Sequence, residues 1–110
     1  MIKKAYVLNN ADLAGYLLKN GRRYVFMYDL RYVLSNKPSI SLSLPVKKRV
    51  FSSPFLFSFF QGLLPEGANK KFHCDMLKID RNDDFSLLLQ LAGSETIGSV
   101  TVRGEYDALP

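Results

Sequence analysis

The chain has 110 residues, of which 47% are hydrophobic, so residues 1–110 are expected to form a single domain with its own core. A single cysteine, Cys74, excludes an intramolecular disulfide, and no apolar run approaches the roughly 20 residues of a membrane helix. These features and the lack of a signal-peptide pattern predict a cytoplasmic protein.

The net charge of +5 is spread over pairs of basic residues and one triplet, Lys47, Lys48 and Arg49. Interspersed surface charge of this kind is typical of a solvated face. Two other interpretations stay open, namely a direct nucleic-acid contact at the triplet and a basic surface that meets an acidic protein partner.

The first third of the chain predicts three strands that form a meander, at residues 3–10, 13–21 and 22–29. Asn20 and Gly21 favour a tight hairpin turn because both central residues of such a turn need positive φ. Residues 39–45, SISLSLP, alternate strictly between serine and large apolar residues, which predicts a fourth strand that Pro45 ends.

The hydrophobic period then changes from two residues to three or four. Residues 54–64 are expected to form a helix with Ser53 as its N-cap and a wide apolar stripe. A second helix is predicted at 67–79, where Phe72, Met76 and Ile79 recur at helical spacing. A third helix is predicted at 83–93, capped by Asp83 or Asp84, and a closing strand at 96–104.

The order of these elements predicts an α+β fold, with a small, mainly antiparallel sheet of about five strands and about three helices packed on one face. No catalytic constellation is visible. His73 is the sole histidine, and we expect it on the surface beside a buried Cys74. The cluster Asp80, Asp83 and Asp84 lacks the ligand spacing of a calcium loop. We therefore expect no cofactor, no metal and no enzymatic activity.

Four segments, taken together, are similar to a known family. They are LAGYL (13–17), SISLSLP (39–45), FFQGLLPEG (59–67) and DDFSLLLQLAGSETIGSVTV (83–102). Their order resembles the N-terminal subdomain of HipA-type serine/threonine kinases of bacterial toxin–antitoxin systems. The similarity spans nearly the whole chain, and the specific part is FFQGLLPEG followed by DDFSLL.

The HipA-type kinases continue into a catalytic core after this subdomain, whereas this chain begins at Met1 and ends at Pro110 without one. It therefore resembles the HipS-type antitoxins of three-component systems, whose HipT-like kinase toxin lacks the subdomain and whose third member is a HipB-like helix-turn-helix protein. The resemblance implies a non-catalytic inhibitor that binds the kinase where the fused subdomain would lie. The alternative is an assembly subunit that completes a HipA-like kinase fold and helps a HipB-like repressor complex hold operator DNA.

The candidate partner-binding residues are Leu63, Leu64, Pro65, Glu66 and Gly67. One interpretation makes this segment a helix end whose two leucines complete the core. The other makes residues 65–67 a partner-facing loop, because a proline lowers the entropy cost of docking and Glu66 offers a charge to a kinase lysine or arginine. The possible nucleic-acid contacts are Lys47, Lys48 and Arg49, with DNA bound at most indirectly and no membrane contact.

Overall fold

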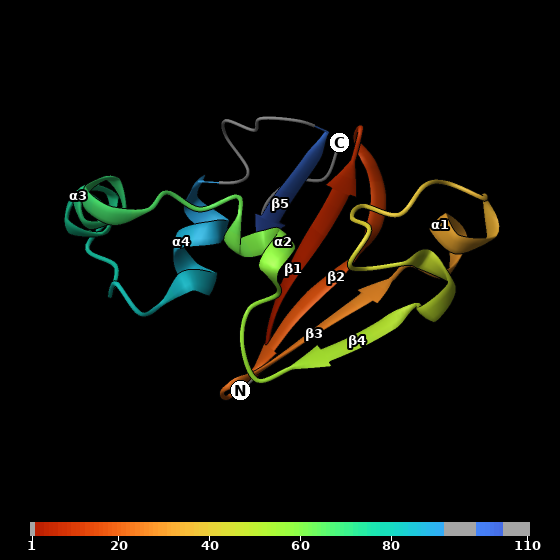
Figure 1. The fold of residues 1–110 in the computed structure, drawn as a ribbon, viewed down its shortest axis with the longest axis horizontal. Helices are drawn as coiled ribbons and strands as arrows, with labels where there is room; N and C mark the ends of the chain where they lie inside the picture. Colours follow the sequence, from red (N-terminus) through yellow and green to blue (C-terminus); the bar gives the residue numbers. More distant parts are fainter. Residues whose placement is uncertain (1, 92–98, 105–110) are drawn as a thin grey trace.

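A computed structural model describes residues 2–91 and 99–104, which form a five-stranded antiparallel sheet with helices at one face and at both ends (Figure 1). The strands lie in the order β4-β3-β2-β1-β5, so the last strand pairs with the first. The α+β prediction is confirmed. The elements are β1 (Ile2–Asn9), β2 (Asp12–Asn20), β3 (Arg23–Tyr28), α1 (Leu30–Leu34), the 3-10 helix η1 (Val46–Lys48), β4 (Val50–Ser53), α2 (Ser58–Gln61), α3 (Gly67–Leu77), α4 (Asp84–Leu91) and β5 (Val100–Gly104).

The meander β1-β2-β3 forms where the sequence predicts it. Of the two predicted turn residues only Gly21 adopts a positive φ, of +62°, because Asn20 is the last residue of β2 and the turn lies at Gly21 and Arg22. Gly15 in β2 has a different role. A Cβ at this position would lie 2.3 Å from the carbonyl oxygen of Met27 on β3, so only a residue without a side chain allows the two strands to approach this closely.

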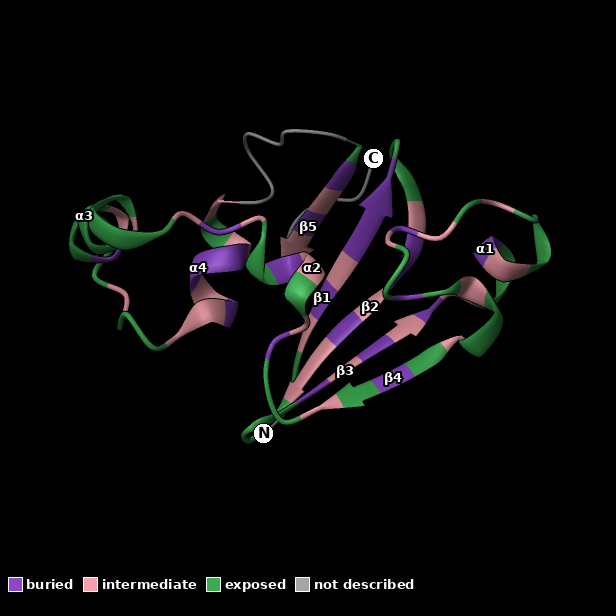
Figure 2. Ribbon diagram, in the orientation of Figure 1, coloured by how far each residue is buried: buried purple, intermediate pink, exposed green. Residues whose placement is uncertain are grey.

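One face of the sheet carries the core. Each strand contributes buried residues to this face, as the purple segments of Figure 2 show. Phe60 of α2 and Phe85, Leu87 and Leu88 of α4 pack into the same hydrophobic cluster. The core therefore lies between the sheet and these two helices, which explains the period of two in the strands and of three to four in the helices.

The predicted strand at residues 39–45 is wrong. The segment folds into turns, in which Ile40 and Leu44 are buried while Leu42 is fully exposed. The Tyr28 hydroxyl accepts a hydrogen bond from the Ile40 N–H at 3.0 Å and donates one to the Leu44 carbonyl, which holds the segment against the core. The serine side chains bond locally, for example Ser41 Oγ with the Ser43 N–H at 3.2 Å, and such bonds compete with a strand ladder.

The fourth strand of the sheet is β4, and it pairs with β3 in an antiparallel ladder. In this ladder Ser53 lies opposite Tyr24. The sequence predicts Ser53 as the N-cap of the next helix. This prediction is wrong, because Ser53 is the last residue of the extended strand β4. Its hydroxyl accepts a bond from the Phe55 N–H at 3.1 Å, and α2 begins four residues beyond Pro54, at Ser58. Phe55, expected on the apolar stripe, is 75% exposed.

The two longer helices form close to their predicted positions. Asp83 caps α4, as expected, because its carboxylate accepts hydrogen bonds from the N–H and the hydroxyl of Ser86. Parts of two predictions, namely Ala92 and Gly93 at the end of the third helix and Thr96 to Gly98 at the start of the last strand, lie outside the described residues. None of the described helices is long and apolar enough to cross a membrane.

Candidate functional site

The segment from Leu63 to Gly67 forms a turn that joins the short helix α2 to α3, and it is half core and half surface. Leu64 is buried with 8% of its surface exposed, and Leu63 is half-buried against the same core. Pro65 is partly buried, whereas Glu66 and Gly67 are exposed. The segment therefore has two parts. The two leucines anchor it to the core, and residues 65–67, which we call the tip, form its outward end.

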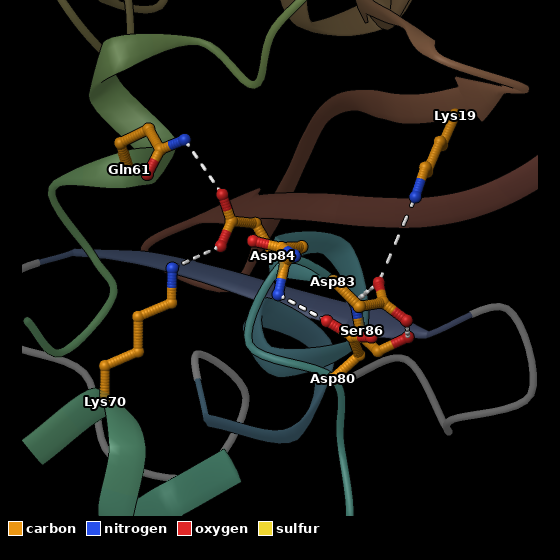
Figure 3. Close-up of polar contacts among 8 residues, drawn as sticks. Lys19, Gln61, Lys70, Asp80, Asp83, Asp84 and Ser86 are labelled. Atoms are coloured by element: carbon orange, nitrogen blue, oxygen red, sulfur yellow. Dashed lines mark hydrogen bonds and ion pairs between the residues drawn. The ribbon is translucent and has the colours of Figure 1, made fainter.

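The two sides of this turn are tied together by Asp84, the first residue of α4 (Figure 3). One carboxylate oxygen of Asp84 accepts a hydrogen bond from Gln61 Nε2 at 3.1 Å, and the other oxygen lies 2.8 Å from Lys70 Nζ. Gln61 ends α2 and Lys70 lies in the first turn of α3. A single carboxylate thus fixes the distance between the two helices that carry the turn. We call Gln61, Lys70 and Asp84 the carboxylate clasp.

The neighbouring carboxylate, Asp83, stabilises the helix from which the carboxylate clasp extends. Burial alone would raise the pKa of Asp83, but the hydrogen bonds from Ser86 and the nearby charges of Lys19 and Lys3 outweigh it and hold this pKa below its usual range. Lys19 Nζ on β2 lies 4.0 Å from Asp83 Oδ1, so the start of α4 is also linked to the sheet.

A depression of about 420 Å³ lies beside the tip. Its lining consists of residues from the turn and the helix ends around it, namely Ser58, Gln61, Gly62, Leu64, Pro65, Glu66, Gly67 and Lys70. Two of these residues belong to the carboxylate clasp, so the shape of the depression depends on it. The hollow thus lies beside an exposed, proline-containing tip.

Helix α3 presents its large apolar residues to solvent, which the sequence did not indicate. Phe72 is 59% exposed and Met76 is 66% exposed, while Cys74 on the opposite side is buried as predicted. His73 is partly buried and its ring lies 5.6 Å from that of Phe72 in an edge-on arrangement. Helical spacing therefore located the helix, but two of the three apolar residues that define this spacing face solvent, because α3 lies at one end of the molecule, away from the sheet (Figure 1).

The basic triplet does not converge on one point. Lys47 and Lys48 of η1 are exposed, and Lys48 Nζ lies 5.1 Å from the centre of the Phe51 ring. Arg49 is partly buried and its Nε donates to the Tyr28 carbonyl at 3.1 Å. Two of the three candidate nucleic-acid contacts are thus accessible, and the third ties the link between η1 and β4 to the end of β3.

Comparison with known proteins identifies the domain. The family model for the HipA N-terminal domain matches residues 5–103. This chain belongs to the HipA N-terminal domain family. A solved structure described as the N-terminal domain of HipA toxin has a TM-score of 0.75 at 26% identity, covering 98% of this chain and 97% of that one. An uncharacterized protein of Haemophilus influenzae is 30% identical over 105 residues, which cover 96% of this chain and 95% of that protein.

This family agrees with the resemblance that the four sequence segments indicate. Gly15 of the LAGYL segment and Asp84 of the DDFSLL segment now have physical roles, the first in close strand packing and the second in the carboxylate clasp. No group of three or more metal-ligating side chains that could hold an ion occurs among residues 2–91 and 99–104.

Proposed function

We propose that this HipA N-terminal domain is an antitoxin that binds a HipT-like serine/threonine kinase and inhibits it without catalysing a reaction. Its site of action is the cytoplasm, where a HipB-like helix-turn-helix protein joins the two in a ternary complex. The observation that carries the proposal is the tip at residues 65–67, which is exposed at Glu66 and Gly67 and belongs to a turn that the carboxylate clasp holds in place.

The inhibition is steric. Two anchors, the buried Leu64 and the carboxylate clasp, restrict the turn before binding, so docking of the tip orders few additional side chains and costs little conformational entropy. The exposed Glu66 pairs with a basic residue of the kinase near its nucleotide-binding lobe. Because an inhibitor must bind the inactive arrangement better than the active one, the docked tip disfavours closure of that lobe.

The length of a related protein supports the proposal that this domain acts without being fused to a kinase core. The Haemophilus influenzae protein is matched over 95% of its own length, so that protein consists almost entirely of this domain. In this proposal the domain affects the kinase by contact and not by chemistry of its own.

The second candidate function is an assembly subunit that completes a HipA-like kinase fold and helps a HipB-like repressor complex hold operator DNA. The exposed Lys47 and Lys48 favour it, since lysines of this kind contact phosphates without sequence preference. Neutralising both lysines would then weaken DNA binding by the complex and reduce its salt dependence.

The test is titration of the purified chain into a HipT-like kinase from the same organism, with autophosphorylation and complex formation followed together. We expect phosphorylation to fall as the complex forms. Normal phosphorylation in a saturated complex would overturn inhibition and favour the assembly function. Absence of any complex would overturn both candidate functions.

A further inference from the structure

The second face of the sheet includes two adjacent rows of side chains that run across the strands. One row crosses all five strands, and the next row crosses four. We call these residues the open sheet face: Arg103, Tyr6, Tyr16, Met27 and Val50 in the first row, and Lys4, Leu18, Val25 and Ser52 in the second. None of these residues belongs to the hydrophobic core cluster, and none of the apolar ones packs against it.

The composition of the open sheet face is unusual for a surface that meets water. An antiparallel sheet with one covered face normally carries polar residues on the other face. Here six of the nine positions hold tyrosine, leucine, valine or methionine. Val50, at the β4 edge, is 45% exposed, and the apolar side chains further in are partly exposed. Contiguous apolar surface of this kind marks an interaction site.

The charged residues of the open sheet face are all basic. Lys4 and Arg103 lie in the two rows, and neither row contains an acidic residue. Lys4 Nζ lies 5.1 Å from the ring centre of Tyr6 and 4.8 Å from that of Tyr16, so its charge is held over the middle of the surface. The complementary partner surface is therefore apolar with an acidic group placed to meet Lys4.

Charge disfavours a second copy of this chain on the open sheet face, and the arrangement of its rings disfavours single-stranded nucleic acid. A second copy in a symmetric contact would bring two basic surfaces together, at a cost from like-charge repulsion. Single-stranded nucleic acid needs flat rings on which bases stack. The rings of Tyr6 and Tyr16 instead meet edge-on at 64°, and Lys4 covers both of them.

We propose that the open sheet face is a second docking surface, against which the HipT-like kinase packs an apolar, acidic patch. This inference rests on the proposed function and extends it from the tip at residues 65–67 to a broad contact. The broad contact supplies affinity through burial of apolar surface, while the tip supplies inhibition. The two surfaces belong to different parts of the fold, so substitutions can separate binding from inhibition.

The test compares two variants on the open sheet face, Val50→Glu and Lys4→Gln, with two controls that change the charge by the same amount elsewhere, Leu42→Glu and Arg22→Gln. Leu42 and Arg22 are exposed in turns, and thermal unfolding checks that all four variants are folded. We expect each face variant to bind the kinase about tenfold more weakly, while the controls stay within about twofold of the wild type.

Each outcome decides the proposal. Wild-type affinity in folded Val50→Glu and Lys4→Gln overturns this docking surface while leaving the proposed function intact. Absence of binding by the wild type overturns the proposed function and this inference with it. A dimer of the free chain that Val50→Glu dissociates would assign the face to a second copy. Binding of a single-stranded oligonucleotide that Lys4→Gln abolishes, with kinase affinity unchanged, would assign it to nucleic acid.

Discussion

Lys70 Nζ lies 2.8 Å from Asp84 Oδ1, and this pair joins the first turn of α3 to the first residue of α4 across the candidate partner-binding turn. Both side chains are mostly buried, with 28% and 19% of their surfaces exposed. The pair is therefore less screened by solvent than a surface ion pair.

The first prediction concerns this pair. Asp84→Asn should loosen both contacts of the carboxylate. We expect a clear loss of kinase inhibition and only a small fall in the free energy of unfolding. A double-mutant cycle with Lys70→Met, measured by urea unfolding, should give a coupling energy of about 0.5–1 kcal/mol. A coupling energy of zero, together with unchanged inhibition by Asp84→Asn, would show that the carboxylate clasp does not order the turn.

The second prediction separates the buried and exposed parts of the turn. Leu64→Ala should destabilise the fold by about 2–4 kcal/mol because it leaves a cavity in the core. Glu66→Lys, by contrast, should change the free energy of unfolding by less than about 0.5 kcal/mol, since its side chain meets solvent. Equal destabilisation by the two substitutions in thermal and urea unfolding would contradict the division of this turn into anchor and tip.

The third prediction concerns pH. Because the folded-state pKa of Asp83 lies below its unfolded value, the ionised carboxylate stabilises the fold above the unfolded pKa. That stabilisation is lost as the pH falls through the folded pKa. Asp83→Ala should cost about 1 kcal/mol at pH 7 through the lost helix cap, and the difference from the wild type should shrink below about pH 4. A difference that stays constant from pH 7 to pH 2.5 in urea unfolding would be inconsistent with this role.

The fourth prediction concerns Gly15. A methyl group at this position would meet the Met27 carbonyl at 2.3 Å, which forces β2 and β3 apart. Gly15→Ala should therefore lower stability by about 1–3 kcal/mol, as overpacking does. Gly21→Ala, in open space but at positive φ, serves as a comparison that isolates backbone strain. A smaller loss for Gly15→Ala than for Gly21→Ala in thermal unfolding would refute the steric explanation.

The residue pattern within each segment predicts β1, β2, β3 and α4. Each of these segments combines a hydrophobic pattern typical of its structure with a turn or capping residue at its boundary. The segment 39–45 misled the prediction because serine alternated with large apolar residues. In the structure those serines form local hydrogen bonds. For example, Ser39 Oγ accepts one from the Val46 N–H at 2.9 Å. Leu42, by contrast, lies in solvent. Whether an apolar residue faces the core depends on contacts between distant segments, which periodicity within one segment does not contain.

The sequence proposes the candidate site at residues 63–67, and the structure adds detail that the sequence does not contain. Residues 63–67 were identified from their composition, and the structure separates Leu64 in the core from Glu66 at the surface. The sequence does not predict the carboxylate clasp, because Asp84 at the start of a helix is equally suited to capping it, a role that Asp83 performs. The open sheet face was also missed, since it appears only when the register of all five strands is known.

The central claim is that the tip of this domain contacts a HipT-like kinase and thereby inhibits it. The most direct measurement is the inhibition constant of Glu66→Lys against kinase autophosphorylation, with Asp75→Lys on the exposed side of α3 as the matched charge reversal. We expect Glu66→Lys to inhibit at least about tenfold more weakly than the wild type, a loss of about 1.4 kcal/mol, with Asp75→Lys close to the wild type. Equal inhibition by the wild type and both variants would contradict the account.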